Sequence, residues 1–127
     1  MILKTKNLVN NISMSDRLPH DPARWGPPAW DFLYCVAFSY PYKPNSEQKK
    51  HMYKFLKSLA YTLPCETCRQ NYKERFKRIS TEKNLRSKRS LVKWIMKLKN
   101  EIASQHNGKL DTYAELCIKY QLNKIEY

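Results

Sequence analysis

Two of the four cysteines in this 127-residue chain stand three positions apart, in the stretch Cys65-Glu66-Thr67-Cys68. Thiols at this spacing are close enough to form a disulfide, and a thiolate at the start of a helix is stabilised by unpaired backbone N–H groups. Such a pair exchanges electrons with other thiols, or it supplies two ligands to a metal ion. The sequence therefore contains one candidate chemical centre, which is redox-active or metal-binding.

The residues around the pair predict that it opens a helix. Pro64 disfavours helical geometry in the residue before it, so the preceding helix ends there. Cys65 is then expected at or near the N-cap of the next helix. Cys68, Tyr72 and Phe76 follow at intervals of four along one side of that helix.

Apolar residues recur at helical spacing in the rest of the chain as well. One helix is expected to begin within Trp25-Gly26-Pro27-Pro28, so that the prolines lie in its first turn, and to end before Pro41 and Pro44. A second begins at an Asn45 or Ser46 cap and buries a stripe of apolar residues, namely Met52, Phe55, Leu56, Leu59 and Leu63.

The second half of the chain predicts two more helices. Residues 78–90 are polar and basic and are expected to form a loop, after which Ser87 or Ser90 opens a helix that ends at Asn107-Gly108. A short fifth helix starts at Asp111 or at the Thr112…Glu115 capping box. The expected fold is all-α, a four-helix bundle with a short fifth helix.

Composition limits the class of protein. The chain has only two glycines and no apolar run of the about 18 to 20 residues that a membrane span needs, and no signal peptide is apparent. One domain is expected over residues 24–127, after a flexible N-terminal arm over residues 1–23. With 24 basic and 11 acidic residues, the net charge of +13 creates a field that attracts nucleic acid, anionic membrane or an acidic partner.

The residues alone suggest three alternatives to a helical redox centre: a zinc site, a thioredoxin-like site, and two cysteines packed as small apolar side chains. A zinc site needs about four ligands, and beyond the pair the chain offers only isolated cysteines and histidines. A thioredoxin-like site needs a strand before the pair, where a helical stripe stands instead. Two cysteines packed as small apolar side chains would not be expected beside Pro64, Glu66 and Arg69, which indicate a partly exposed helix start.

Three motifs occur in a fixed order between Trp25 and about Tyr120: Trp25-Gly26-Pro27-x-x-Trp30-x-x-Leu33 with Phe38-x-Tyr40-Pro41, Leu63-Pro64-Cys65-x-x-Cys68, and Trp94-x-x-x-Leu98-x-Asn100-x-Ile102. In this order and spacing the chain resembles the FAD-dependent sulfhydryl oxidases of the Erv/ALR family, and its short form is similar to the members encoded by large DNA viruses, including poxvirus-like ones. The resemblance implies that FAD is held between helices. It also implies a thiol oxidase activity, in which Cys65 meets an incoming protein thiol, Cys68 lies next to the flavin, and electrons pass to O₂ to give H₂O₂.

The resemblance also implies FAD contacts at nine positions, which are Gly26, Trp30, Tyr34, Trp94, Lys99, Asn100, Ala103, Lys109 and Tyr113. The chain departs from the common pattern at some of them. Tyr34 and Lys99 stand where most members have histidine, and Ala103 replaces a second asparagine. Lysine can still neutralise a diphosphate as a point charge, and the aromatic residues can wall the adenine.

The resemblance further implies a homodimer formed through the first two helices, and work in a reducing compartment such as the host cytoplasm at viral assembly sites, with the virion as a further location. Because neither terminal arm carries a cysteine, electrons are expected from a separate thiol protein, such as a small thioredoxin-like carrier. Cys35 and Cys117 are expected as free, half-buried thiols, with a bridge between them as the alternative.

Two rival interpretations remain open at this point. A basic nucleic-acid-binding helical module would explain the charge of residues 73–78 and 86–89, although the chain has no helix-turn-helix signature. A structural zinc adaptor would use the cysteine pair as ligands.

Overall fold

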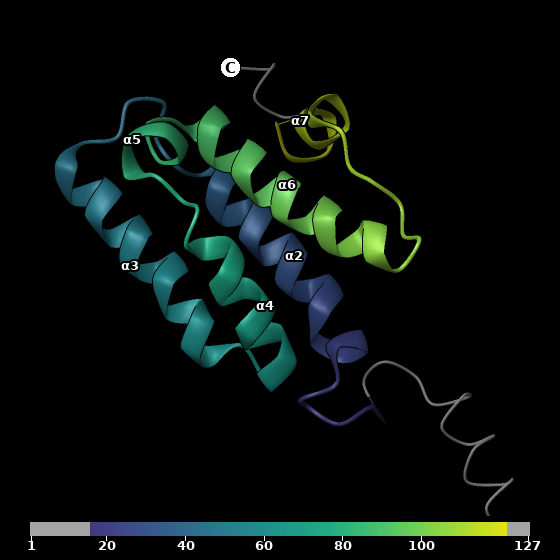
Figure 1. Ribbon diagram of the computed structural model, residues 1–127. Coiled ribbons are helices and arrows are strands. Elements are labelled where there is room, and N and C mark those ends of the chain that lie inside the picture. Colours follow the sequence, from purple (N-terminus) through teal and green to yellow (C-terminus); the bar gives the residue numbers. More distant parts are fainter. Residues whose placement is uncertain (1–15, 122–127) are drawn as a thin grey trace, which may run out of the picture.

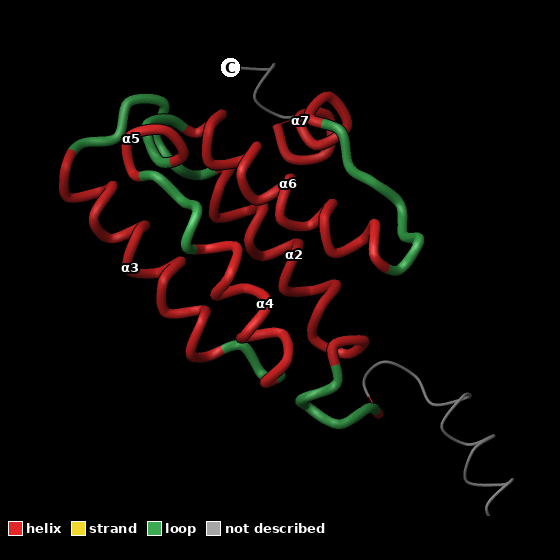
Figure 2. The backbone as a smooth tube through the Cα atoms, viewed as in Figure 1, coloured by secondary structure: helices red, strands yellow, loops and turns green. Residues whose placement is uncertain are grey.

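The structure, a computed structural model, describes residues 16–121 (Figures 1 and 2). These residues form helices and loops only, and no strand occurs among them. The helices are α2 (Pro22–Phe38), α3 (Ser46–Thr62), α4 (Glu66–Phe76), α5 (Thr81–Asn84), α6 (Lys88–Gln105) and α7 (Tyr113–Gln121). The all-α prediction is therefore confirmed for the described part of the chain.

Side-chain caps explain where the helices begin. The Asp21 carboxylate accepts from the backbone N–H of Ala23 at 2.9 Å at the start of α2. Of the two predicted caps, Asn45 and Ser46, Asn45 caps α3, and it forms a reciprocal capping box with Gln48. Ser87 caps α6 by accepting from the backbone N–H of Ser90 at 3.1 Å.

Four long helices lie side by side in two pairs, and α7, seen end-on in Figure 1, crosses them. In one pair α2 packs along α6, and in the other α3 packs along α4, while α7 rests on α2 and α6. The core between these helices includes the fully buried side chains of Leu56, Leu85, Leu91, Val92 and Ile95. A buried hydrogen bond of 2.7 Å from the Tyr40 hydroxyl to the Leu85 carbonyl ties the end of α2 to the α5–α6 connection.

Two predicted boundaries are wrong. The helix α2 starts at Pro22 rather than after residue 23, because Asp21 caps it and proline suits the first helical position. Pro27 and Pro28 therefore lie inside α2 and not in its first turn. The predicted loop over residues 78–90 contains the one-turn helix α5, which Ser80 caps.

The predicted N-terminal arm falls largely outside the described residues, which begin at residue 16. Residues 16–21 are tied to α2 by contacts of their own. Arg17 forms an ion pair with Asp21 at 3.3 Å, and the Trp25 indole N–H donates to the His20 carbonyl at 3.2 Å.

Within residues 16–121, no helix combines the length and apolar character that crossing a membrane requires.

Candidate active site

The cysteine pair lies at the turn between α3 and α4, at the same end of the bundle as the first turn of α2 (Figure 1). Leu63, at the C-terminal end of α3, has the extended backbone (φ −53°, ψ 139°) that a following proline imposes. Cys65 is the N-cap of α4, and its Sγ accepts a hydrogen bond from the backbone N–H of Cys68 at 3.2 Å. The sequence prediction of a cysteine at the start of this helix is confirmed.

The pKa values of the two thiols are shifted in opposite directions. The hydrogen bond that the Cys68 thiol donates lowers the pKa of Cys65, and the backbone amides of Cys68 and Thr67 and the charge of Arg69 add to this effect. Burial, followed by the hydrogen bond to Cys65 and the charge that Cys65 carries, raises the pKa of Cys68 to about 12. In the reduced pair Cys65 is therefore the thiol that loses its proton first.

Arg69 braces this turn. Its guanidinium Nη1 donates to the carbonyl oxygen of Leu63 at 2.6 Å, across the break between α3 and α4. The positive charge of Arg69 acts to lower the pKa of both cysteines, although burial and Cys65 raise the pKa of Cys68 overall. A half-buried arginine thus fixes the geometry of the turn and stabilises the thiolate that forms in it.

Cys68 lies on the inward side of α4. The next two residues on that side, Tyr72 and Phe76, are buried, and the Tyr72 hydroxyl donates to the carbonyl of Leu56 on α3. Both rings contact Trp94 of α6 edge-on, with ring centroids 6.4 Å apart. The face of α4 that carries Cys68 therefore looks toward α6, and Cys65 stands at the end of the helix.

A second cluster forms around Asp111, in the loop between α6 and α7. Its carboxylate accepts from the Tyr34 hydroxyl of α2 at 2.8 Å and pairs with the Lys99 ammonium of α6 at 2.9 Å. The Asn100 side chain exchanges two hydrogen bonds with the Asp111 backbone, of 2.8 and 2.9 Å. Partial burial opposes ionisation of Asp111, but Lys99 and Tyr34 hold its pKa below the ordinary value.

The structure brings together only some of the nine positions that the family resemblance marks. Tyr34, Lys99 and Asn100 meet at Asp111. Ala103 touches Gly108 close by, since a Cβ on that glycine would come within 3.3 Å of the Ala103 Cβ.

The other five positions lie apart from the Asp111 cluster. Lys109 is exposed and pairs with Glu115 at 3.2 Å, and Tyr113 lies under the cations of Arg89 and Lys93. Gly26 and Trp30 are half-buried on α2, and Trp94 faces α4.

Asp111 and Arg69 are functional candidates that the sequence alone did not identify. Asp111 was considered only as a helix cap, although Thr112 performs that role by accepting from the Glu115 backbone N–H at 3.2 Å. Its partner Tyr34 is 77 positions away, so no local spacing connects the two. The one feature of the sequence that could have identified Arg69 is its position directly after the second cysteine.

The other cysteines remain separate. Cys35 on α2 and Cys117 on α7 are both free; Cys117 is half-buried as predicted, whereas Cys35 is exposed, because it lies on the outer side of α2. Among residues 16–121 no three histidine, cysteine or acidic side chains lie close enough to hold a metal ion. The segment before the cysteine pair is the helix α3, which is not the strand that a thioredoxin-like site has.

Comparison with protein families shows that the Erv1 / Alr family model matches residues 27–121. A probable FAD-linked sulfhydryl oxidase of Acanthamoeba polyphaga mimivirus is 37% identical over 95 residues, which cover 74% of this chain and 66% of that protein. The mitochondrial FAD-linked sulfhydryl oxidase ERV1 of Saccharomyces cerevisiae is 27% identical over 84 residues, which cover 66% of this chain and 43% of that protein. The chain thus spans from 43 to 66% of the length of these relatives.

Solved structures share the fold. The yeast Erv1 core superposes with a TM-score of 0.74 at 22% sequence identity, over 83% of this chain and 87% of that one. The FAD-binding domain of yeast Erv1 superposes with a TM-score of 0.69, also at 22% identity, over 75% of this chain and 89% of that one. The arrangement of helices around the cysteine pair is therefore one that these proteins have as well.

Proposed function

The chain belongs to the Erv1 / Alr family, and on this premise we propose that it is an FAD-dependent thiol oxidase, which converts protein thiols into disulfides and passes the electrons to O₂. The observation that carries the proposal is the Cys65–Cys68 pair at the start of α4, with a lowered pKa on Cys65 and a raised pKa on Cys68. The net reaction is 2 R–SH + O₂ → R–S–S–R + H₂O₂.

Thiol–disulfide exchange uses the two cysteines differently. A partner thiolate attacks Sγ of Cys65 in the oxidised pair, so that a mixed disulfide forms and Cys68 leaves with the bonding electrons. A second partner thiolate attacks the partner's sulfur in the mixed disulfide, which releases the partner as a disulfide and Cys65 as a thiolate. The low pKa of Cys65 favours this last step, because a more acidic thiol is a better leaving group.

The state of Cys65 controls the acidity of Cys68. Two of the causes that raise the pKa of Cys68 are its hydrogen bond to Cys65 and the charge on Cys65. Both disappear while Cys65 is held in a mixed disulfide, and the charge of Arg69 remains. Burial, the largest cause, still raises the pKa of Cys68 in this state, but the Cys68 thiolate forms more readily in the step in which it leaves than it does beside an ionised Cys65.

The residues present fit FAD in three respects. Within residues 16–121, a Cβ at Gly26 would meet nothing within 4 Å, so this part of the chain leaves open space beside α2 at that point. Trp30 offers half-buried aromatic surface for a flat ring. Lys109 is held only by an exposed ion pair, which costs little to exchange for a diphosphate.

The nine residues would then have two kinds of role. Gly26, Trp30, Lys109 and Tyr113 would line or touch FAD, and Trp94 would support the site from α6 through its edge-on contacts with Tyr72 and Phe76. The remaining residues would support the site without touching FAD, because their side chains already contact residues 108–111; they are Tyr34, Lys99, Asn100 and Ala103. FAD, when bound, would supply the two-electron acceptor that returns the cysteine pair to its disulfide and the chemistry that reduces O₂.

We propose further that the protein works as a homodimer through α2 and α3 and takes electrons from a separate thiol protein, such as a small thioredoxin-like carrier. An apolar groove of about 360 Å³ between these helices supports the dimer, and Val36, Met52 and Phe55 help to line it. The proposed place of work is the host cytoplasm at viral assembly sites and the virion, and the viral origin of two relatives supports the viral setting.

The visible spectrum of the purified protein tests the oxidase proposal. Bound FAD gives a yellow protein, and oxygen uptake with dithiothreitol as the thiol should depend on Cys65 and Cys68 and be unaffected by the Cys35→Ser and Cys117→Ser substitutions. A colourless protein that neither binds added FAD nor consumes oxygen would contradict the proposal. A Cys68→Ser variant with full activity would contradict the roles assigned to the two cysteines.

A further inference from the structure

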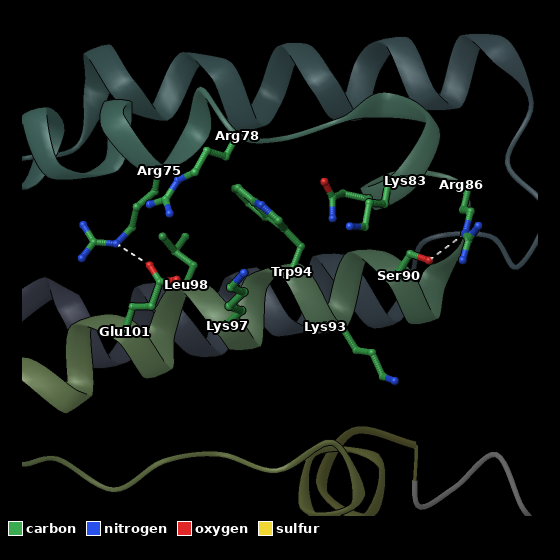
Figure 3. A pocket seen from close by; sticks show the side chains of 11 residues that line it. Arg75, Arg78, Lys83, Arg86, Ser90, Lys93, Trp94, Lys97, Leu98 and Glu101 are labelled. Carbon is green, nitrogen blue, oxygen red and sulfur yellow. Dashed lines mark hydrogen bonds and ion pairs between the residues drawn. The ribbon is translucent and has the colours of Figure 1, made fainter.

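A basic groove runs between the end of α4, α5 and α6 (Figure 3). Its volume is about 360 Å³, which lies in the range of ligand-binding cavities. Six cationic side chains from α4, α5, α6 and the connections between these helices line it, and these are Arg75, Arg78, Lys83, Arg86, Lys93 and Lys97. In sequence they are spread over 23 positions, so only the fold gathers them.

Most of this positive charge has no counter-charge. Glu101 is the acidic residue in the lining, and it is taken up by Arg75, whose Nε donates to it at 2.9 Å. Within residues 16–121, no ion-pair partner is present for Arg78, Lys83 or Lys97. Like charges collected in a concave surface repel one another and focus a positive potential, and a bound anion relieves that repulsion.

An aromatic side chain stands among these cations. Trp94 projects from α6 toward α4, with Arg75 and Arg78 to one side and Lys83 to the other (Figure 3). The rings of Tyr72 and Phe76 meet the indole nearly at right angles, with interplanar angles of 81° and 82°. These contacts hold the indole in place while it remains half-exposed to the groove.

The hollow continues along α6. A second depression, bounded by Met96, Asn100 and Ser104, shares Arg75, Lys97 and other residues with the basic groove. An extended chain therefore fits this surface better than a compact ion does.

We propose that the basic groove binds single-stranded nucleic acid, with phosphates on Arg78, Lys83, Arg86 and Lys97 and a base against Trp94. Cations that follow a backbone, combined with a fixed aromatic ring, are the features that such sites share. The groove lies at the C-terminal end of α4 and the cysteine pair at its N-terminal end, about 16 Å apart for a helix of 11 residues. Binding therefore leaves Cys65 accessible, and the proposal does not depend on the oxidase function.

Fluorescence anisotropy of a labelled oligothymidine, with the FAD-loaded protein, tests the proposal. Affinity should fall as salt rises, with a slope of about −0.7 in log K per log salt for each phosphate neutralised. The variant Arg78→Ala/Lys83→Ala/Arg86→Ala/Lys97→Ala should bind about tenfold more weakly and lose about 2 to 3 units of that slope.

A matched control removes the same charge elsewhere. Lys43, Lys50, Lys54 and Lys57 lie on or before α3, are exposed and have no ion-pair partner among the described residues. Their fourfold alanine variant should keep most of the affinity and of the slope. Equal losses in the two variants would mean that net charge, and not the groove, attracts the oligonucleotide.

Three further outcomes overturn the proposal. One is binding of poly-glutamate as tightly as oligothymidine, which would make the groove a site for an acidic protein. Another is equal affinity for duplex DNA, since a duplex offers no free base to Trp94. The third is displacement of the oligonucleotide by added FAD from protein prepared without it, which would assign the groove to the cofactor.

Discussion

The hydroxyl of Tyr34 and the carboxylate of Asp111, 77 positions apart in the chain, are joined by a hydrogen bond of 2.8 Å. This bond connects the middle of α2 to the loop after α6, and Lys99 completes the cluster from α6 itself. One side chain thus links three segments that would together form one wall of the proposed FAD site.

Replacing Asp111 by asparagine should lower the free energy of unfolding by about 1 to 2 kcal/mol. The change leaves the Lys99 ammonium, whose side chain is only 23% exposed, without its partner. The measurement is urea unfolding followed by circular dichroism. Glu115→Gln is the control, because its pair with Lys109 is exposed and should change stability by less than about 0.5 kcal/mol. Similar effects of both substitutions would argue against a special role for the Asp111 cluster.

Ionised Asp111 should contribute to the free energy of unfolding, and this contribution should be lost in acid. Its pKa is lowered from the ordinary 3.8, so below that value the unfolded chain binds a proton that the folded protein does not. The stabilisation from Asp111 is complete above the unfolded pKa and is lost as the pH falls from there through the folded pKa. Urea unfolding across this range should show a steeper acid loss for the wild type than for Asp111→Asn. Parallel curves would contradict the assignment.

In the reduced protein near neutral pH, iodoacetamide should modify Cys65 before Cys68. The lower pKa of Cys65 gives it the larger thiolate fraction, whereas Cys68 keeps its proton up to a pKa of about 12. Mass spectrometry of timed samples measures the order. Cys68→Ala should shift the modification profile of Cys65 to higher pH, because the donated hydrogen bond is gone. Faster modification of Cys68 would reverse the roles of the two thiols.

Arg69→Met should raise the pKa of Cys65, seen as a shift of its alkylation profile to higher pH. Arg69→Lys should restore part of the effect, since lysine keeps the charge but cannot reproduce the guanidinium's fixed geometry on the Leu63 carbonyl. Arg24, on the first turn of α2, provides a control: Arg24→Met should leave the profile unchanged. If Lys and Met at position 69 behave alike, the hydrogen bond and not the charge matters.

Phe32→Glu should convert the proposed dimer into monomers. The Phe32 ring is 59% exposed on α2 and meets Phe55 of α3 edge-on, at 6.5 Å between ring centroids, beside the apolar groove of these helices. Light scattering after size-exclusion chromatography gives the mass. Ile118→Glu on α7, at 66% exposure, should leave the mass unchanged. A wild-type monomer at micromolar concentration would already refute the dimer.

The sequence was sufficient for the elements that local chemistry determines. Pro64 marks the end of α3 as predicted, and of the predicted alternatives Asn45 or Ser46 and Ser87 or Ser90, Asn45 and Ser87 are the caps. The position of Cys65 at the N-cap follows from the same local rules. The short helix α5 was missed because its polar sequence has no apolar stripe, and Tyr40, whose hydroxyl donates to the carbonyl of its C-cap Leu85, is 45 positions away.

Contacts between distant segments could not be read from spacing. The basic groove combines residues of α4, the α4–α5 connection, α5 and α6, and its cations follow no single helical face. The Asp111 cluster depends on where the loop after α6 returns to α2. In both cases the residue types were visible, but the partners became evident only in three dimensions.

The two prolines inside α2 interrupt the cooperativity of that helix. Pro27 and Pro28 have no amide hydrogen, so two successive rungs of the hydrogen-bond ladder, to the carbonyls of Ala23 and Arg24, are missing. Both prolines are exposed, and water can satisfy these carbonyls. The missing hydrogen bonds separate the first turn of α2 from its buried residues Leu33, Tyr34, Ala37 and Phe38. The first turn, next to Gly26, is therefore expected to unwind at a lower cost in free energy than the rest of the helix.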